Sequence, residues 1–141
     1  GAPILFSIST IIEKNRNQYY DALKNAQSSL EISDWITYFA DVILQAQAEA
    51  LQTVKFSLYK MAFFDRYKTE LGERELKAVN KMFDAGADGF EGGMTAKKYM
   101  SITRTSKATA TRDLQHLVEI GVFVAQGSGR NVHYQLDKNY E

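Results

Sequence analysis

The sequence lacks the residue types on which several classes of protein depend. The chain of 141 residues has no cysteine, which excludes disulfides, thiolate metal sites and a cysteine nucleophile. Its two histidines, His116 and His133, are isolated, so we expect no metal site. No apolar run approaches the ~18 residues of a membrane span, and no signal peptide opens the chain. We therefore expect a cytoplasmic protein that has no membrane segment, metal or cofactor.

The sequence also has little proline and no net charge. Pro3 is the only proline, which predicts long helices and few rigid loops. The chain has 17 basic and 17 acidic side chains. This balance argues against a strong general DNA binder, because non-specific binding depends on phosphate neutralisation, so a basic face has to be argued from individual residues. Gly1 before Ala2 and Pro3, in place of an initiator methionine, suggests a fragment.

Residues 1–70 are predicted to form a helical region. A first helix is expected over Ile8–Asn25, with Ser7 or Ser9 as its cap. A second helix, capped by Ser33 or Asp34, is expected to run to about Tyr67, roughly 50 Å at 1.5 Å per residue. A helix of this length exceeds what a small domain can bury. It is either a connector wrapped by its neighbours or a self-association surface, the latter widened by Phe56, Phe63 and Phe64.

Residues 71–141 are predicted to form a winged helix-turn-helix domain, with its pattern between Glu73 and Leu136. A short helix ending before Gly86 and a glycine-rich loop at 85–93 come first. Next are a helix over Ala96–Ile102 with Thr95 as cap, a tight turn at 103–105, and a helix from the cap Ser106 to Ile120, which Gly121 ends. Ala110, Leu114, Leu117 and Val118 are expected on the buried side of that last helix. Strands at 122–125 and 131–136 then enclose a glycine-containing hairpin tip. The fold class is thus mainly α with a small β-hairpin.

A DNA-binding face follows from that fold, because the second helix of such a pair enters the major groove by its N-terminal half. Arg112 has the geometry for a guanine or a phosphate, and the threonine hydroxyls suit phosphates or base edges. The predicted contacts are Ser106, Lys107, Thr109, Thr111, Arg112 and His116 on the helix, with Arg130 and Asn131 at the wing tip. Phosphate contacts are also expected from Lys97, Lys98 and Arg104. The alternative is a solvated helix face, with Asp113 and Glu119 as local acid.

Two stretches resemble the C-terminal part of Fic-family proteins. Pro3–Ser7 followed by Ile12–Leu23, which contains a Tyr-Tyr-x-x-Leu run, resembles the segment after the catalytic helix of Fic domains, and Trp35 with Phe39 resembles the start of the next helix. Thr95–Lys97, Ser106–Gly121 and Gly127–Arg130 resemble the winged helix often appended to them. The resemblance implies a parent enzyme that transfers AMP or a related group to a protein hydroxyl. The family's His-Pro-Phe-x-Asp-Gly-Asn-Gly-Arg loop has no match here, so we expect no catalytic residue in this chain.

Three functional hypotheses remain open. The first, which we prefer, is a regulatory module that binds double-stranded DNA. The second is a protein-interaction or dimerisation module, acting through the long helix, that positions or regulates the parent enzyme. The third is a free-standing transcriptional regulator whose N-terminal helices form a sensor or a dimer arm.

Overall fold

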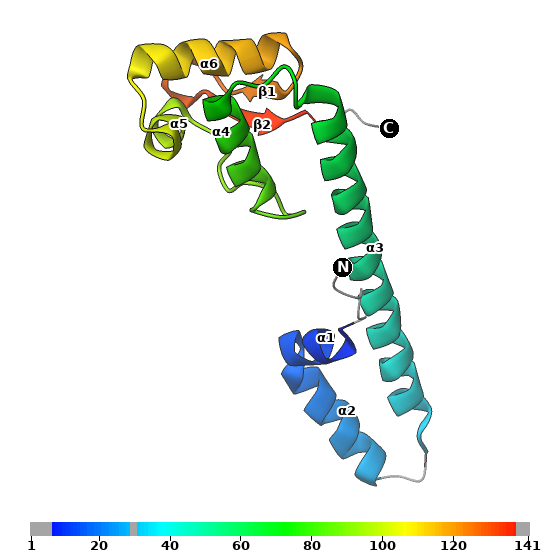
Figure 1. Cartoon of the computed structure of the whole chain (residues 1–141). Helices are drawn as coiled ribbons and strands as arrows, with labels where there is room; N and C mark the ends of the chain where they lie inside the picture. Colours follow the sequence, from blue (N-terminus) through cyan, green and yellow to red (C-terminus); the bar gives the residue numbers. More distant parts are fainter. Residues whose placement is uncertain (1–6, 29–30, 138–141) are drawn as a thin grey trace. The chain divides into compact units, whose positions relative to one another are not determined.

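The computed structural model describes residues 7–28 and 31–137, and of Arg130 only the backbone. The protein is mainly helical with one small antiparallel hairpin, as predicted (Figure 1). It forms two compact units, residues 1–55 and residues 56–141. The long helix α3 (Ser33–Tyr67) contributes residues to both units. The boundary therefore lies inside α3, whereas the predicted division after Glu70 falls within the second unit.

The first unit begins with two helices where the sequence predicted one. Helix α1 (Ile8–Lys14) is capped by Ser7, whose hydroxyl accepts the Thr10 N–H at 3.2 Å. Helix α2 (Arg16–Ser28) follows after a break at Asn15. The Asn15 side-chain amide donates to the Ile11 carbonyl at 3.3 Å, and its own N–H also reaches back to that carbonyl. An asparagine that competes for backbone acceptors ends a helix, which explains why the single predicted helix over Ile8–Asn25 is wrong.

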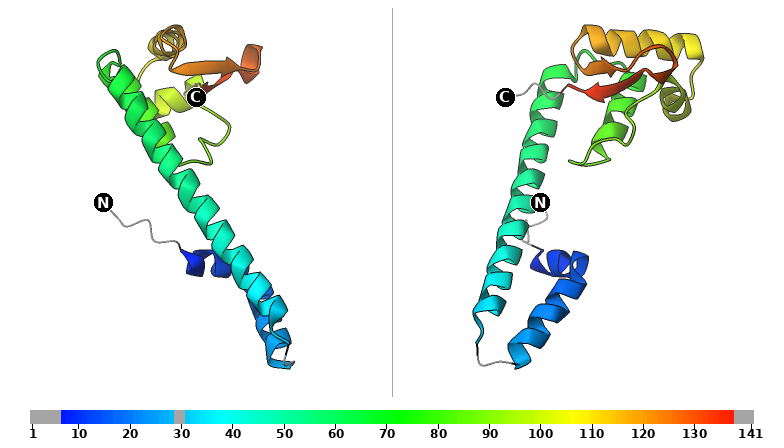
Figure 2. Two further views of the ribbon diagram at one scale, coloured as in Figure 1. Left: turned by 90° about the vertical axis from the view of Figure 1, so that its right-hand side faces the viewer. Right: turned by 180° about the vertical axis from the view of Figure 1, so that it is seen from behind.

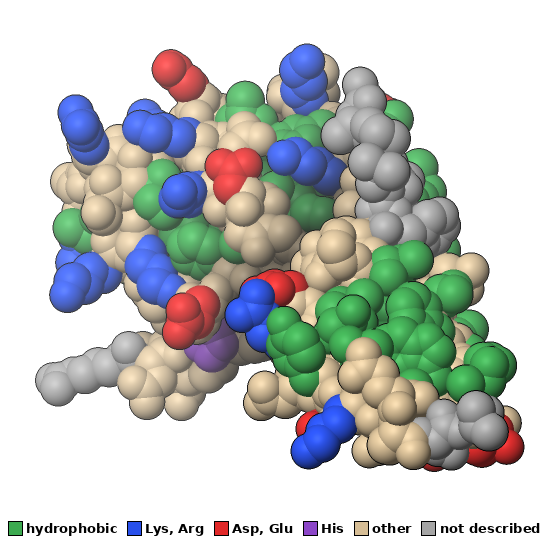
Figure 3. Space-filling model, turned by 90° about the horizontal axis from the view of Figure 1, so that it is seen from below, with side chains coloured by type: hydrophobic (Ala, Val, Ile, Leu, Met, Phe, Trp, Pro, Cys, Tyr) green, Lys and Arg blue, Asp and Glu red, His purple; other side chains and the backbone are tan. Residues whose placement is uncertain are grey.

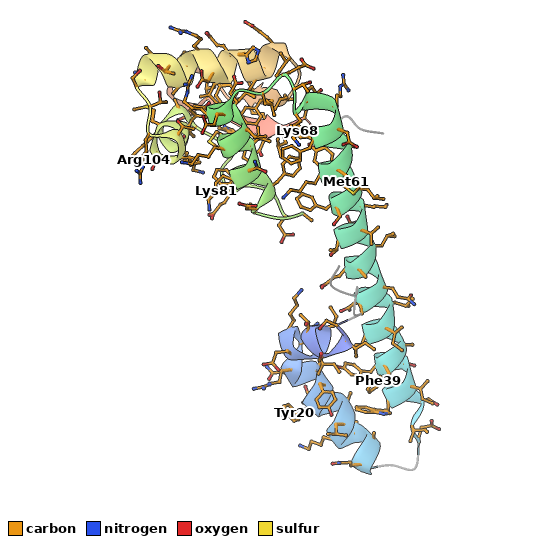
Figure 4. The ribbon with its side chains drawn as sticks, in the orientation of Figure 1. Tyr20, Phe39, Met61, Lys68, Lys81 and Arg104 are labelled. Carbon is orange, nitrogen blue, oxygen red and sulfur yellow. The ribbon has the colours of Figure 1, made fainter. Side chains whose placement is uncertain are left out.

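The core of the first unit is small. Its fully buried side chains in the described residues are Ile11 from α1 with Val42 and Ala46 from α3, and Ile8, Ile12 and Tyr38 pack against them. Helix α2 buries no described side chain. It contributes Tyr19, whose ring lies 5.9 Å from that of Trp35 on α3; Figure 4 labels Tyr20 and Phe39 in the same region. Lys14 and Glu49 join α1 to α3 by an exposed ion pair of 2.9 Å.

The second unit has the element order that the sequence predicted. After α3 come α4 (Glu73–Phe83), α5 (Ala96–Thr103) and α6 (Lys107–Glu119). Strands β1 (Phe123–Gln126) and β2 (His133–Leu136) pair antiparallel, with Phe123 opposite Leu136, and a 3-10 turn, η1 (Gly129–Asn131), lies between them. The hairpin lies against α6 in every view (Figures 1 and 2). The glycine-rich stretch is a loop, as predicted, but Met94 at its end forms an isolated antiparallel bridge with Tyr134 of β2, which the sequence did not indicate.

The core of the second unit includes the phenylalanines of α3. Phe63 is 5% exposed, and Phe56 and Phe64 pack against the same buried cluster. The Phe63 and Phe83 rings lie 5.0 Å apart between centroids. These aromatic side chains therefore attach α3 to α4 within one unit, and the interpretation that Phe56, Phe63 and Phe64 widen a self-association surface is wrong.

The predicted caps of α5 and α6 and the glycine predicted to end α6 are confirmed. Thr95 accepts the Lys98 N–H and Ser106 accepts the Thr109 N–H, each as the predicted cap. Gly121 follows α6 with φ of 76°, a conformation that glycine adopts without strain. Val118 is the exception on α6: it is 37% exposed rather than buried. Among the described residues, no helix combines the length and apolar character needed to cross a bilayer.

Candidate nucleic-acid interface

The first turns of α6 carry most of the predicted contact residues. Arg104, which ends α5, has φ of 55° and ψ of 45° and turns the chain toward α6. Ser106 then occupies the cap position, with its hydroxyl 3.3 Å from the Thr109 N–H and 3.1 Å from the Thr109 hydroxyl. Figure 4 shows Arg104 directed away from the helices around it. The tight turn thus places the N-terminus of α6 at the surface.

Lys107 and Arg112 are the cations on the exposed side of α6. Both side chains are exposed, and within the described residues neither forms an ion pair. The Thr111 hydroxyl donates to the Lys107 carbonyl at 3.0 Å, and Thr109 is half-buried at the cap. The two cations are therefore available to an anionic partner, whereas the two threonine hydroxyls are already engaged with the helix itself.

Asp113 lies on the opposite side of α6, toward the core. It is 7% exposed and accepts hydrogen bonds from Arg74 Nε at 3.0 Å and Arg74 Nη2 at 3.3 Å. The buried Tyr99 hydroxyl of α5 donates to the same carboxylate at 2.9 Å. Burial raises the pKa of Asp113, but the hydrogen bonds from Arg74 and Tyr99 outweigh it and hold the pKa below 3.8. The carboxylate is therefore ionised and joins α4, α5 and α6, while its charge still interacts electrostatically with the neighbouring Arg112.

His116 contacts α4 rather than standing alone on the predicted face. Its Nδ1 lies 2.7 Å from Glu75 Oε1, and Glu75 Oε2 accepts the Gly72 N–H at 2.9 Å at the start of α4. The hydrogen bond to Glu75 raises the pKa of His116 above 6.5, against the opposing effect of burial. One ring nitrogen is thus committed to the protein, which makes His116 a weaker candidate for a partner than Lys107 or Arg112.

The lysines of α5 differ in their availability. Lys97 is exposed. Lys98 is half-buried and its ammonium donates to the Glu91 and Gly93 carbonyls, the latter at 3.0 Å. The same ammonium lies 4.8 Å from the centre of the Phe90 ring. Lys98 therefore holds the glycine-rich loop in place, which restricts its predicted contact with phosphate.

The hairpin tip has a close backbone approach. Gly127 has φ of 79°, and a Cβ there would lie 2.5 Å from the Asn131 carbonyl oxygen, so only glycine fits. Asn131 is exposed at the end of η1. It was predicted to belong to the second strand, but it precedes β2. The side chain of Arg130, the other predicted contact at the tip, lies outside the described part of the structure.

The contact helices form a locally basic segment in a neutral chain. Between Met94 and His116 the sequence has one acidic side chain, the inward-facing Asp113, and it has five basic ones: Lys97, Lys98, Arg104, Lys107 and Arg112. Counting charge per segment would have found this stretch, and the spacing of Asp113 with Ala110, Leu114 and Leu117 marks it as inward-facing. Figure 3, seen from below, shows Lys and Arg side chains interspersed with Asp and Glu on that side of the molecule, and it does not show the outer side of α6.

In the part of the chain that the structure describes, no three or more His, Asp or Glu side chains come together in a group that could hold a metal ion. Comparison of the chain with models of known protein families finds no match, and no curated protein is significantly similar to it.

Proposed function

We propose that residues 73–136 are a winged helix-turn-helix module that binds double-stranded DNA. In this proposal the N-terminal half of α6 enters the major groove, and the β1–β2 hairpin contacts the neighbouring backbone. Support comes from the order α4, α5, turn, α6, β1, β2, together with the exposed position of the α6 N-terminus. The proposal extends to a regulatory role within a Fic-type parent protein.

The observation that carries the proposal is the separation of charge across α6. Lys107 and Arg112 are exposed without ion-pair partners in the described residues, while Asp113 is turned inward and neutralised by Arg74. A helix face that served only as solvated surface would need no such separation. Asp113 still interacts electrostatically with Arg112, and Glu119 is exposed near the other end of α6. The separation of charge is therefore clearest at the N-terminus of the helix, where Lys107 has no carboxylate of α6 close to it in sequence.

The expected binding is moderate and sensitive to salt. If Lys97, Arg104, Lys107 and Arg112 each neutralise about one phosphate, log K should fall with log salt concentration with a slope of about −3.6. Removing one phosphate contact lowers that slope by about 0.9 and weakens binding to all sequences alike. Removing a guanine contact instead costs about 1–3 kcal/mol at one base position.

The test is fluorescence anisotropy of a labelled mixed-sequence duplex, titrated with the chain at several salt concentrations. Three proteins are compared: the parent chain, Lys107→Ala/Arg112→Ala, and the control Arg16→Ala/Lys24→Ala. Arg16 and Lys24 are exposed cations of α2 in the first unit, so the control removes the same net charge far along the sequence from α6. We expect the α6 variant to lose most of its affinity and about 1.8 units of salt slope, and the control to lose little.

Two results would contradict this function. One is the absence of measurable binding at low salt. The other is an equal loss of affinity in both double variants, which would attribute binding to net charge rather than to α6. Far-UV circular dichroism of each variant should match the parent chain, because all four substituted side chains are exposed.

A further inference from the structure

Helix α3 presents an unusual surface within the first unit. Val42 and Ala46 face the small core at 4% exposure each. At 100° per residue, Leu44 and Leu51 lie about 140–200° around the helix from the two buried residues. They are 61% and 54% exposed. The helix is therefore apolar on two opposite sides, of which the described residues of the first unit cover one.

The uncovered side is largely apolar, and we name it the outer α3 face. It consists of the exposed side chains Ala40, Ile43, Leu44, Ala48 and Leu51, with the exposed Gln47 among them. Two exposed charges, Asp41 and Lys55, flank it on the same side. In the described residues neither of these two forms an ion pair. They are fourteen residues apart, about 21 Å along a helix, so one cannot reach the other.

We propose that the outer α3 face binds the same face of a second copy of this chain, with the two α3 helices antiparallel. An antiparallel pair centred near Ala48 places Asp41 of each copy opposite Lys55 of the other. The same register brings Leu44 of one copy close to Leu51 of the other. Alanines at positions 40 and 48 allow the helices to approach closely.

Charge and symmetry together select this partner and this orientation. A two-fold axis makes every contact occur twice, so one Asp–Lys match becomes two. A parallel pair in register would instead place Asp41 level with Asp41 and Lys55 level with Lys55. Opposite charges at the flanks of an apolar seam set partner choice and orientation in paired helices.

The available area predicts a reversible dimer. Each exposed leucine or isoleucine on this face offers on the order of 100 Å² of apolar surface. Three such side chains with two alanines at about 50 Å² each give about 400 Å² per copy, so the pair would bury about 800 Å² in total, in the range of weak and transient interfaces. We therefore expect a dissociation constant in about the micromolar range, with monomer at high dilution.

Sedimentation velocity over a wide concentration range tests the proposal. The parent chain should shift from monomer to dimer, and Leu44→Glu/Leu51→Glu should weaken the dimer at least about tenfold, because burying an unpaired carboxylate opposes association. Both leucines are more than half exposed, so the monomer should keep its helix content by circular dichroism.

Charge reversal tests the orientation. Asp41→Lys and Lys55→Asp should each weaken the dimer, because each places like charges opposite one another twice. The double variant Asp41→Lys/Lys55→Asp should restore the parental affinity. Asp21→Lys and Lys24→Asp, at exposed positions of α2, are matched controls and should leave association unchanged.

Three outcomes would overturn the proposal. A chain that stays monomeric at the highest concentration excludes a second copy as the occupant of this face. A dimer indifferent to the leucine substitutions places the contact elsewhere. A double charge reversal that fails to restore affinity excludes the antiparallel pairing. These measurements contain no DNA, so they are independent of the function proposed for α6.

Discussion

The stability of the second unit should depend on the hydrogen bond between Tyr99 and Asp113. Tyr99 is fully buried on α5, and its hydroxyl donates to Asp113 of α6 at 2.9 Å. Tyr99→Phe removes one hydrogen bond to a charged acceptor, a loss of about 1.5–3 kcal/mol. Asp113→Ala removes the same bond and also leaves the tyrosine hydroxyl unpaired in the interior, which adds about 1–3 kcal/mol.

The double variant tests whether the two side chains lose stability through the same hydrogen bond. Tyr99→Phe/Asp113→Ala has no unpaired hydroxyl and loses the shared hydrogen bond only once, so its loss should fall short of the sum of the two single losses by about 2.5–6 kcal/mol. Arg74→Ala should lower the free energy of unfolding by less than Tyr99→Phe does. The Arg74 side chain is 53% exposed, so water can take its place as a hydrogen-bond donor to Asp113.

The assay is urea unfolding followed by far-UV circular dichroism, with hydrogen exchange of the α5 and α6 amides as a second probe. Fluorescence of Trp35, the single tryptophan, reports the first unit and serves as an internal control. The reasoning would be refuted if the unfolding free energies lost in Tyr99→Phe and Asp113→Ala added up to the loss in the double variant. Equal hydrogen-exchange protection of the α5 and α6 amides in all the variants would refute it as well. Because the pKa of folded Asp113 lies below 3.8, its contribution is present at neutral pH and is lost as the pH falls through that folded value.

Two further predictions concern α3 and α6. Phe63→Ala should destabilise the second unit by about 3–5 kcal/mol, whereas Leu58→Ala on the same helix, at 59% exposure, should change stability by less than about 0.5 kcal/mol; thermal unfolding of both variants would show the reverse if Phe63 were a surface residue. The raised pKa of His116 means that its pair with Glu75 stabilises fully below pH 6.5 and loses that effect as the pH rises through the folded pKa. The parent chain should therefore lose up to about 1 kcal/mol relative to His116→Gln between about pH 6 and pH 8, and parallel pH profiles in urea titrations would contradict this.

Local chemistry was predictable from the sequence where a single residue type determines it. Ser7, Thr95 and Ser106 cap helices because the hydroxyl oxygen of each accepts an N–H of the first turn, and Gly121 ends α6 because it accepts a positive φ. The break at Asn15 was missed because the apolar periodicity continues through it, while the event that ends the helix is one side-chain hydrogen bond.

Contacts between elements were the harder part. The periodicity of α3 shows that Phe63 and Leu44 are both apolar, but it does not show which of them has a neighbour, and the structure buries the first and exposes the second. The pairing of Arg74 with Asp113 spans thirty-nine residues, and no local pattern encodes that separation. In the candidate site the sequence identified the exposed cations Lys107 and Arg112, but not the commitment of Lys98 and His116 to contacts inside the unit.

Glu75 divides its two carboxylate oxygens between the first N–H of the α4 cap and the His116 ring of α6. The closing of one helix end and the protonation of a side chain on another helix are thus linked equilibria with a single coupling free energy, and that coupling is reciprocal. Whatever free energy the cap loses when His116 gives up its proton, His116 must lose the same amount of proton affinity when the cap opens.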